Sequence, residues 1–171
     1  INRIIMSLNQ KQINIKNLLK SCSIETTPNV YDKYGKFSNI VSLNNSIYVT
    51  YLPDENAKRV IETSKKLNEE GYDVIPHLPE RTIKDISDLE KFIGALSEKA
   101  GCKKILVIGG GGNQKGNISS SMDVLNTELL SKFNFKEVGL AGHPEGNPDI
   151  SEKNMDKAII EKNAFARNTN L

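Results

Sequence analysis

The sequence has few of the residues that hold small secreted or metal-binding domains together. Its 171 residues include only two cysteines, Cys22 and Cys102, which are far apart and form no CxxC motif. This disfavours a disulfide framework or a structural zinc site. Free thiols are typical of a reducing compartment, so we expect a cytoplasmic protein. No apolar run approaches the roughly 20 residues of a membrane span, and polar residues interrupt the opening segment 1–12 where a signal peptide would be apolar.

Neither sign of charge dominates the chain. It has 23 basic and 21 acidic residues and a formal net charge of +2, which gives no basis for a nucleic-acid partner. Hydrophobic residues make up 37% and charged residues 26%, as in soluble globular proteins. We therefore interpret residues 1–171 as a single domain without a nucleic-acid or membrane partner. The length is too short for a complete (β/α)8 barrel, which needs about 200 to 250 residues.

Short apolar runs alternate with amphipathic stretches. Strands are predicted over residues 22–27, 46–52, 73–78, 103–109 and 137–142. Helices are predicted over residues 55–70, 86–100, 120–132 and 151–166, with a weaker pattern over 9–20. Continuous apolar runs bounded by glycine or proline favour parallel strands covered on both faces. The alternation predicts an α/β fold with about five parallel strands, intervening helices and right-handed crossovers.

Polar residues at helix ends predict caps. Ser87 and Glu90 have the spacing of a capping box, and Ser119 to Ser121 are placed to cap the next helix near Asp123. Gly71 is a plausible C-terminal cap.

In parallel α/β proteins, catalytic and binding residues lie at the carboxyl ends of the strands. Both histidines of the chain, His77 and His143, fall at the ends of predicted strands. Glu25 lies in an apolar strand, so we expect its carboxyl to be partly desolvated and its pKa raised, which suits a general acid. A strand glutamate that is hydrogen-bonded or faces solvent is the structural alternative. Glu25 with the two histidines could also form a 2-His-1-carboxylate metal site, although the spacing has no local signature.

Glycines follow the fourth predicted strand as the run Gly109 to Gly112. Such a run lets the backbone approach a ligand closely. It is neither a Walker A motif nor a GxGxxG motif that opens a helix, and a flexible surface turn is the alternative. The stiff polar loop over residues 142–149 combines two prolines and two glycines with His, Glu, Asn and Asp.

Five segments, in this order and spacing, resemble the methylenetetrahydrofolate reductase family: SIETTP, IYVTYLP, VIPHLPERT, ILVIGG and GLAGHPEGNPDI. The resemblance runs from about residue 22 to the end of the chain. It implies part of a (β/α)8 TIM barrel and a flavoprotein oxidoreductase that holds FAD. Such an enzyme reduces 5,10-methylenetetrahydrofolate to 5-methyltetrahydrofolate, in the one-carbon metabolism that supplies methionine. The electron donor would be a reduced nicotinamide.

The resemblance also assigns roles to single residues. Glu25 would be the general acid that protonates the folate and helps to open its five-membered ring. The positions that match FAD contacts in the family are Thr50, His77, Gly109, Gly110, Gly111, Ala141, His143, Asn147, Asp156 and Lys162. Among them, Asp156 and Lys162 would contact the nucleotide half. No metal ion is implied.

The chain departs from the family in two respects. Gly111 stands where the family usually has an aspartate close to flavin and folate, which favours a relative that binds flavin or folate without reducing it. The chain also stops at Leu171, before a sixth strand, and we interpret it as the N-terminal part of a barrel that is inactive alone. A natural half-barrel that forms a homo-oligomer is an alternative. An unrelated barrel that binds a metal or a phosphate is another.

Overall fold

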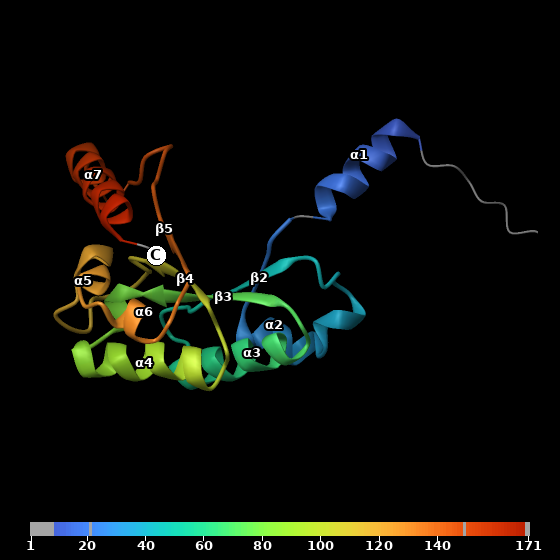
Figure 1. The fold of residues 1–171 in the computed structure, drawn as a ribbon, viewed down its shortest axis with the longest axis horizontal. Coiled ribbons are helices and arrows are strands. Elements are labelled where there is room, and N and C mark those ends of the chain that lie inside the picture. Colours follow the sequence, from blue (N-terminus) through green and yellow to red (C-terminus); the bar gives the residue numbers. More distant parts are fainter. Residues whose placement is uncertain (1–8, 21, 149, 170–171) are drawn as a thin grey trace, which may run out of the picture.

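Five parallel strands form one sheet in the computed structural model, which describes residues 9–20, 22–148 and 150–169 (Figure 1). The strands are β1 (Ile24–Thr26), β2 (Ser46–Val49), β3 (Asp73–Pro79), β4 (Lys104–Ile108) and β5 (Glu137–Leu140). Strands β2 to β5 each pair in parallel with the strand before them in the chain, in the order β1-β2-β3-β4-β5. The predicted strands and the α/β class are confirmed, and the fold is consistent with a partial barrel.

Helices join successive strands. The described elements are α1 (Gln10–Leu19), α2 (Pro28–Tyr34), α3 (Ala57–Glu69), α4 (Ile86–Glu98), α5 (Ser121–Leu125), α6 (Leu129–Lys132) and α7 (Glu152–Asn168), with the short 3-10 helices η1 (Phe37–Asn39) and η2 (Glu80–Thr82). Because the strand order never reverses, right-handed crossovers place the connecting helices on the same face of the sheet. Figure 1 shows α2, α3, α4 and α6 together below the sheet. No helix in the described residues is long and apolar enough to cross a bilayer.

Two local predictions differ from the structure, and one helix was not predicted. The single helix expected over 120–132 is divided into α5 and α6, because Glu128 adopts a left-handed conformation with φ of 60° and interrupts the turn. Helix α2 was not predicted, although Thr27 caps it and Pro28 occupies its first turn. Helix α4 begins at Ile86, so its cap is Asp85, which accepts from the Asp88 amide at 2.8 Å, and not Ser87.

The other predicted caps are confirmed. Ser120 and Asp123 form a reciprocal capping box at the start of α5. Gly71 follows α3 with a φ of 96°, in the region that favours glycine.

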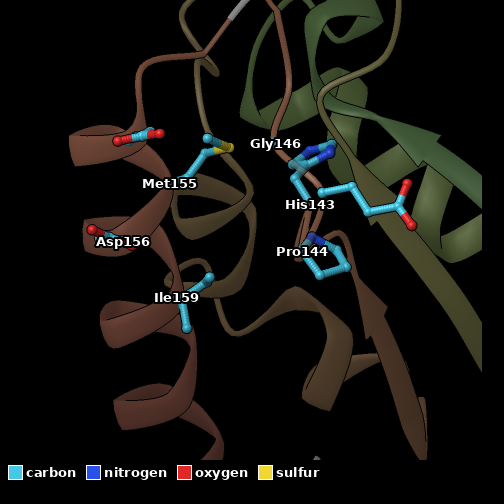
Figure 2. Close-up of a pocket in the computed structure, with 8 residues that line it drawn as sticks. His143, Pro144, Gly146, Met155, Asp156 and Ile159 are labelled. Carbon is cyan, nitrogen blue, oxygen red and sulfur yellow. The ribbon is translucent and has the colours of Figure 1, made fainter.

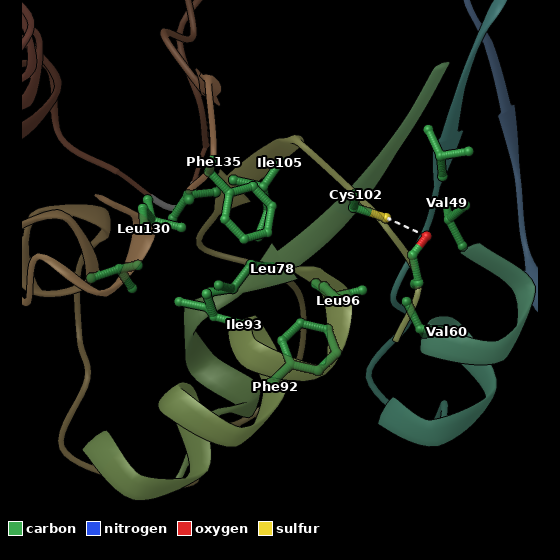
Figure 3. Packing of buried hydrophobic residues seen from close by; sticks show 14 of the residues in the cluster. Val49, Val60, Leu78, Phe92, Ile93, Leu96, Cys102, Ile105, Leu130 and Phe135 are labelled. Carbon is green, nitrogen blue, oxygen red and sulfur yellow. Dashed lines mark hydrogen bonds between the residues drawn. The ribbon is translucent and has the colours of Figure 1, made fainter. Parts of the chain in front are cut away.

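The hydrophobic core lies between the sheet and these helices (Figure 3). Alternate strand residues such as Val49, Leu78 and Ile105 are fully buried, and they pack with fully buried residues of α3 and α4, among them Val60 and Ile93. Cys102 is part of this core, and burial raises the pKa of its thiol to about 12. The thiol is therefore protonated at neutral pH and acts as a small apolar side chain.

The opposite face of the sheet is not covered by these helices. Strand residues alternate between the two faces, so Glu25, Tyr48 and His77 lie on this second face, away from the core. Burial alternates along β2 and β4, whereas β3 is buried from Val74 to Pro79. The expectation that all strands are covered on both faces is therefore wrong for the described residues and holds only for the central strand, β3.

Candidate active site

Three of the predicted site residues gather on the second face, near the carboxyl ends of β1, β2 and β3. The Thr50 hydroxyl donates a hydrogen bond of 2.6 Å to Oε1 of Glu25. The Thr50 amide donates to the Thr26 carbonyl at 2.8 Å, so the residue is held by the adjoining strand. The ring of Tyr48, which is paired with Glu25 in register, meets the His77 ring edge-on at 6.0 Å between centroids. An acid, a hydroxyl and an imidazole thus share one surface.

Glu25 itself is exposed to solvent in the described structure. The expectation of a partly desolvated carboxyl is therefore wrong here, because the strand's apolar neighbours turn toward the helices while Glu25 turns to the uncovered face. The structural alternative, a strand glutamate that is hydrogen-bonded and faces solvent, describes its present surroundings. A general-acid role would depend on a ligand that covers this face.

His77 is buried and has no hydrogen-bond partner at either ring nitrogen. Burial lowers the pKa of His77 below its ordinary value of 6.5, and the Glu25 carboxylate opposes that shift only in part. The ring is therefore neutral near pH 7, with one donor and one acceptor available. Buried polar atoms without partners are rare in folded proteins and need a reason. A ligand that supplies the missing partners would be such a reason.

This burial makes stability depend on pH. When the chain unfolds, the pKa of His77 returns to about 6.5, so below that pH the unfolded chain binds a proton that the folded chain does not. The free energy of unfolding should therefore decrease as pH falls from about 7.5 to about 5.5. Urea denaturation of the wild type and of His77→Gln at both pH values should show a smaller decrease in the variant. His143→Gln is the control, and an equal decrease in wild type and His77→Gln would contradict the prediction.

The glycine run after β4 is held against the segment after β3. The Arg81 amide donates to the Gly109 carbonyl at 3.3 Å, and the Lys115 amide donates to the Arg81 carbonyl at 2.8 Å. Gly110 and Gly112 have φ of 77° and 82°, which glycine adopts without strain. A side chain on Gly116 would overlap the Lys84 carbonyl. Backbone hydrogen bonds thus hold the loop at Gly109 and Lys115, while Gly111 and Gly112 between them are exposed on the surface.

A second group of predicted residues lines a cavity of about 410 Å³ beside this loop. Gly109, Ala141, His143 and Lys162 all border it. Lys162, from α7, donates a hydrogen bond of 2.8 Å to the Ala141 carbonyl, which ties the helix to the end of β5. The cavity therefore brings together the ends of β4 and β5 and a cationic side chain, a combination that suits a ligand with an anionic group.

An adjoining cavity of about 450 Å³ lies between α7 and the loop after β5 (Figure 2). Figure 2 shows Met155 and Ile159 on α7 across from His143 and Pro144 on the loop. His143 has a φ of 48°, a conformation that is uncommon for residues other than glycine. His143 lines both cavities, so the polar loop predicted from the sequence forms the wall between them.

The remaining predicted residues are more scattered. Asp156 is exposed on α7 at the second cavity, and Asn147 forms a bridge with Ile150 within the loop. Gly110 packs on Pro79, while Gly111 is exposed close to Pro53. The described residues hold no group of three or more His, Cys, Asp or Glu side chains that could bind a metal ion, so Glu25, His77 and His143 do not form the alternative metal site.

Glu80 was not among the predicted site residues. It follows directly after β3 and lines the 410 Å³ cavity. It is only 7% exposed, and its Oε2 has no hydrogen-bond partner. Burial raises the pKa of its carboxyl, while Lys162 and Arg81 oppose the shift. The sequence did contain a signal for Glu80: it is an acidic residue between Pro79 and Arg81 at the end of a predicted strand. Catalytic and binding residues are common at such strand ends in parallel α/β proteins. No protein-family model matches the sequence.

Proposed function

We propose that the chain carries the first part of a flavin-dependent reductase that acts on 5,10-methylenetetrahydrofolate. The observation that carries this proposal is the contact between Glu25 and Thr50 on the same surface as His77, whose ring nitrogens have no partners. The resemblance assigns an acid to the first position and cofactor contacts to the other two. A proton donor near an imidazole whose nitrogens have no partners supports such a reduction.

The Glu25–Thr50 contact indicates which oxygen would hold the transferred proton. The Thr50 hydroxyl donates to Oε1 of Glu25, so Oε1 is already engaged as an acceptor. Oε2 is then the atom left to carry a proton. A flat ligand lying over this face would exclude water from the carboxyl and favour its neutral form. Thr50 would keep the side chain oriented while Oε2 delivers the proton to the folate.

The residues present fit a flavin nucleotide. The neutral ring of His77 offers a donor and an acceptor, the glycine loop lets backbone approach closely, and Lys162 adds a positive charge beside the cavity. When bound, FAD would supply the hydride, taken from a reduced nicotinamide. The chain's own residues would bind and orient the cofactor through these groups.

Lys162 provides a test of flavin binding. Titration of the protein with FAD, followed by flavin fluorescence, should give saturable binding that weakens roughly tenfold or more in Lys162→Ala, since a hydrogen bond to a charged group contributes about 1.5–3 kcal/mol. Lys157→Ala is the matched control, because Lys157 lies on the same helix with its side chain 72% exposed and pairs with Glu161. A wild type that binds no FAD would overturn the proposal.

Gly111 favours a second candidate, a relative that binds flavin or folate without reducing the folate. The residue is exposed beside Pro53 and supplies no carboxylate where the family usually has one. The two candidates agree on cofactor binding and differ only in the transfer to folate. Measuring the two half-reactions separately, as described for Glu25 below, decides between them.

A further inference from the structure

The 410 Å³ cavity contains a buried acid that no part of the proposed reaction uses. Glu80 begins η2, immediately after β3, and lines the cavity together with Gly109 and Lys162. Its side chain lies against the glycine loop, where a Cβ on Gly109 would come within 3.6 Å of Oε1. Oε2 is shielded from solvent and has no partner. A carboxyl in this position is therefore incompletely satisfied by the described residues.

The charged groups around Glu80 do not pair with it. Lys162 on α7 directs its ammonium to the Ala141 carbonyl, and no ion pair joins Glu80 to Lys162 or to the neighbouring Arg81 among the described residues. Asp123 on α5 adds a negative charge that disfavours ionisation. Desolvation is the largest influence and raises the pKa of Glu80. A neutral carboxyl offers one donor and one acceptor side by side.

The walls of the cavity suit a flat ring. Apolar side chains from two directions border it, Ile108 at the end of β4 and Met155 and Ile159 on α7. Lys162 has further N–H groups beyond the one given to Ala141 and can meet a phosphate or carboxylate. The cavity therefore combines an apolar slot, a donor–acceptor pair and a cation.

We propose that Glu80 is a specificity-determining residue that recognises the edge of a nitrogen heterocycle on which an N–H donor lies beside an acceptor. The adenine of a nucleotide and the pterin ring of a folate both carry such an edge. The inference deepens the proposed function and rests on it for the kind of ligand. Two hydrogen bonds between the ring edge and the carboxyl would satisfy the group that is unpartnered in the described structure.

The experiment measures binding of AMP, N6,N6-dimethyl-AMP and 6-methylpterin to the protein by calorimetry. If adenine is the ligand, wild type should bind AMP at least tenfold more tightly than the dimethyl analogue, which has lost its amino donor. If pterin is the ligand, 6-methylpterin should bind in place of AMP. Glu80→Gln keeps a donor and an acceptor and should retain the tighter binding. Glu80→Met keeps the size without either and should lose at least tenfold in affinity for the preferred ring.

The pH dependence gives a second readout. Wild-type affinity should fall as pH rises through the raised pKa of Glu80, whereas Glu80→Gln should bind independently of pH in that range. Thermal unfolding of both variants checks that they fold, and replacing an unpaired buried acid should not destabilise the protein.

Three outcomes would overturn the inference: Glu80→Met binds as tightly as wild type, wild type does not distinguish AMP from its dimethyl analogue and binds no pterin, or no probe binds. The FAD titration is a separate measurement. FAD binding in a protein that shows no Glu80-dependent binding of either AMP or 6-methylpterin would refute this inference alone. Glu80-dependent binding of AMP without any FAD binding would refute the reductase proposal alone.

Discussion

Replacing Glu25 with glutamine should nearly abolish folate reduction while flavin reduction by the nicotinamide donor continues. Glutamine has the same shape, and its amide oxygen can still accept from the Thr50 hydroxyl, so the local structure should persist. It cannot deliver a proton in the way a carboxylic acid does. General acid catalysis contributes typically about 10²–10⁴-fold, and we expect a loss of that order in the folate half-reaction.

The two half-reactions are measured in the complete reductase that would contain this chain, by stopped-flow absorbance of the flavin, first with the nicotinamide donor and then with folate as acceptor. Glu62→Gln, at an exposed position on α3, is the control and should change neither rate. If both rates survive in Glu25→Gln, Glu25 is not the acid. If the donor reduces the flavin of the wild type but the reduced flavin transfers no hydride to folate, the result would instead support the second candidate, a relative that binds without reducing.

A methyl group on Gly116 should destabilise the fold and detach the glycine loop from its support. A Cβ there would overlap the Lys84 carbonyl, a backbone atom that cannot rotate away. The neighbouring amides of Lys115 and Asn117 donate to the carbonyls of Arg81 and Lys84, so shifting the loop would strain both bonds. Overpacking of this kind costs about 1–3 kcal/mol, and FAD affinity should fall with it.

Gly142→Ala is the matched control for this change. No atom lies within 4 Å of a Cβ at Gly142, although this residue also borders the 410 Å³ cavity. Its urea denaturation midpoint should stay near that of wild type, within about 0.5 kcal/mol. Equal stability of Gly116→Ala and Gly142→Ala would show that the loop adapts without cost and that its packing does not shape the site.

The sheet was predictable because its strands are short apolar runs with clear ends. Leu106 and Val107 in β4, for example, sit in an unbroken apolar segment that ends at Gly109. The division of the helix predicted over 120–132 was not predictable by periodicity, since it depends on a left-handed residue, Glu128, that carries no sequence signal of its own. Helix α2 did have a signal, because threonine followed by proline is typical of a helix start.

The site was predictable only in outline. The sequence places polar residues at strand ends, and the structure brings Glu25, Thr50 and His77 onto one surface. Burial depends on what the fold lays over each residue, and no local pattern encodes that. Glu25 is exposed because the helices cover the other face, whereas Glu80, which follows directly after β3, is buried against Gly109 of the glycine loop.

The order of the strands bears on how the chain acquires its structure. Each strand from β2 to β5 pairs with the strand before it in the chain. During synthesis at about 5–20 residues per second, each newly emerged strand therefore finds its docking edge already formed. Assembly can proceed in one direction from β1 to β5, in which case the strands that carry Glu25 and His77 would pair before β5 and α7 complete the cavity.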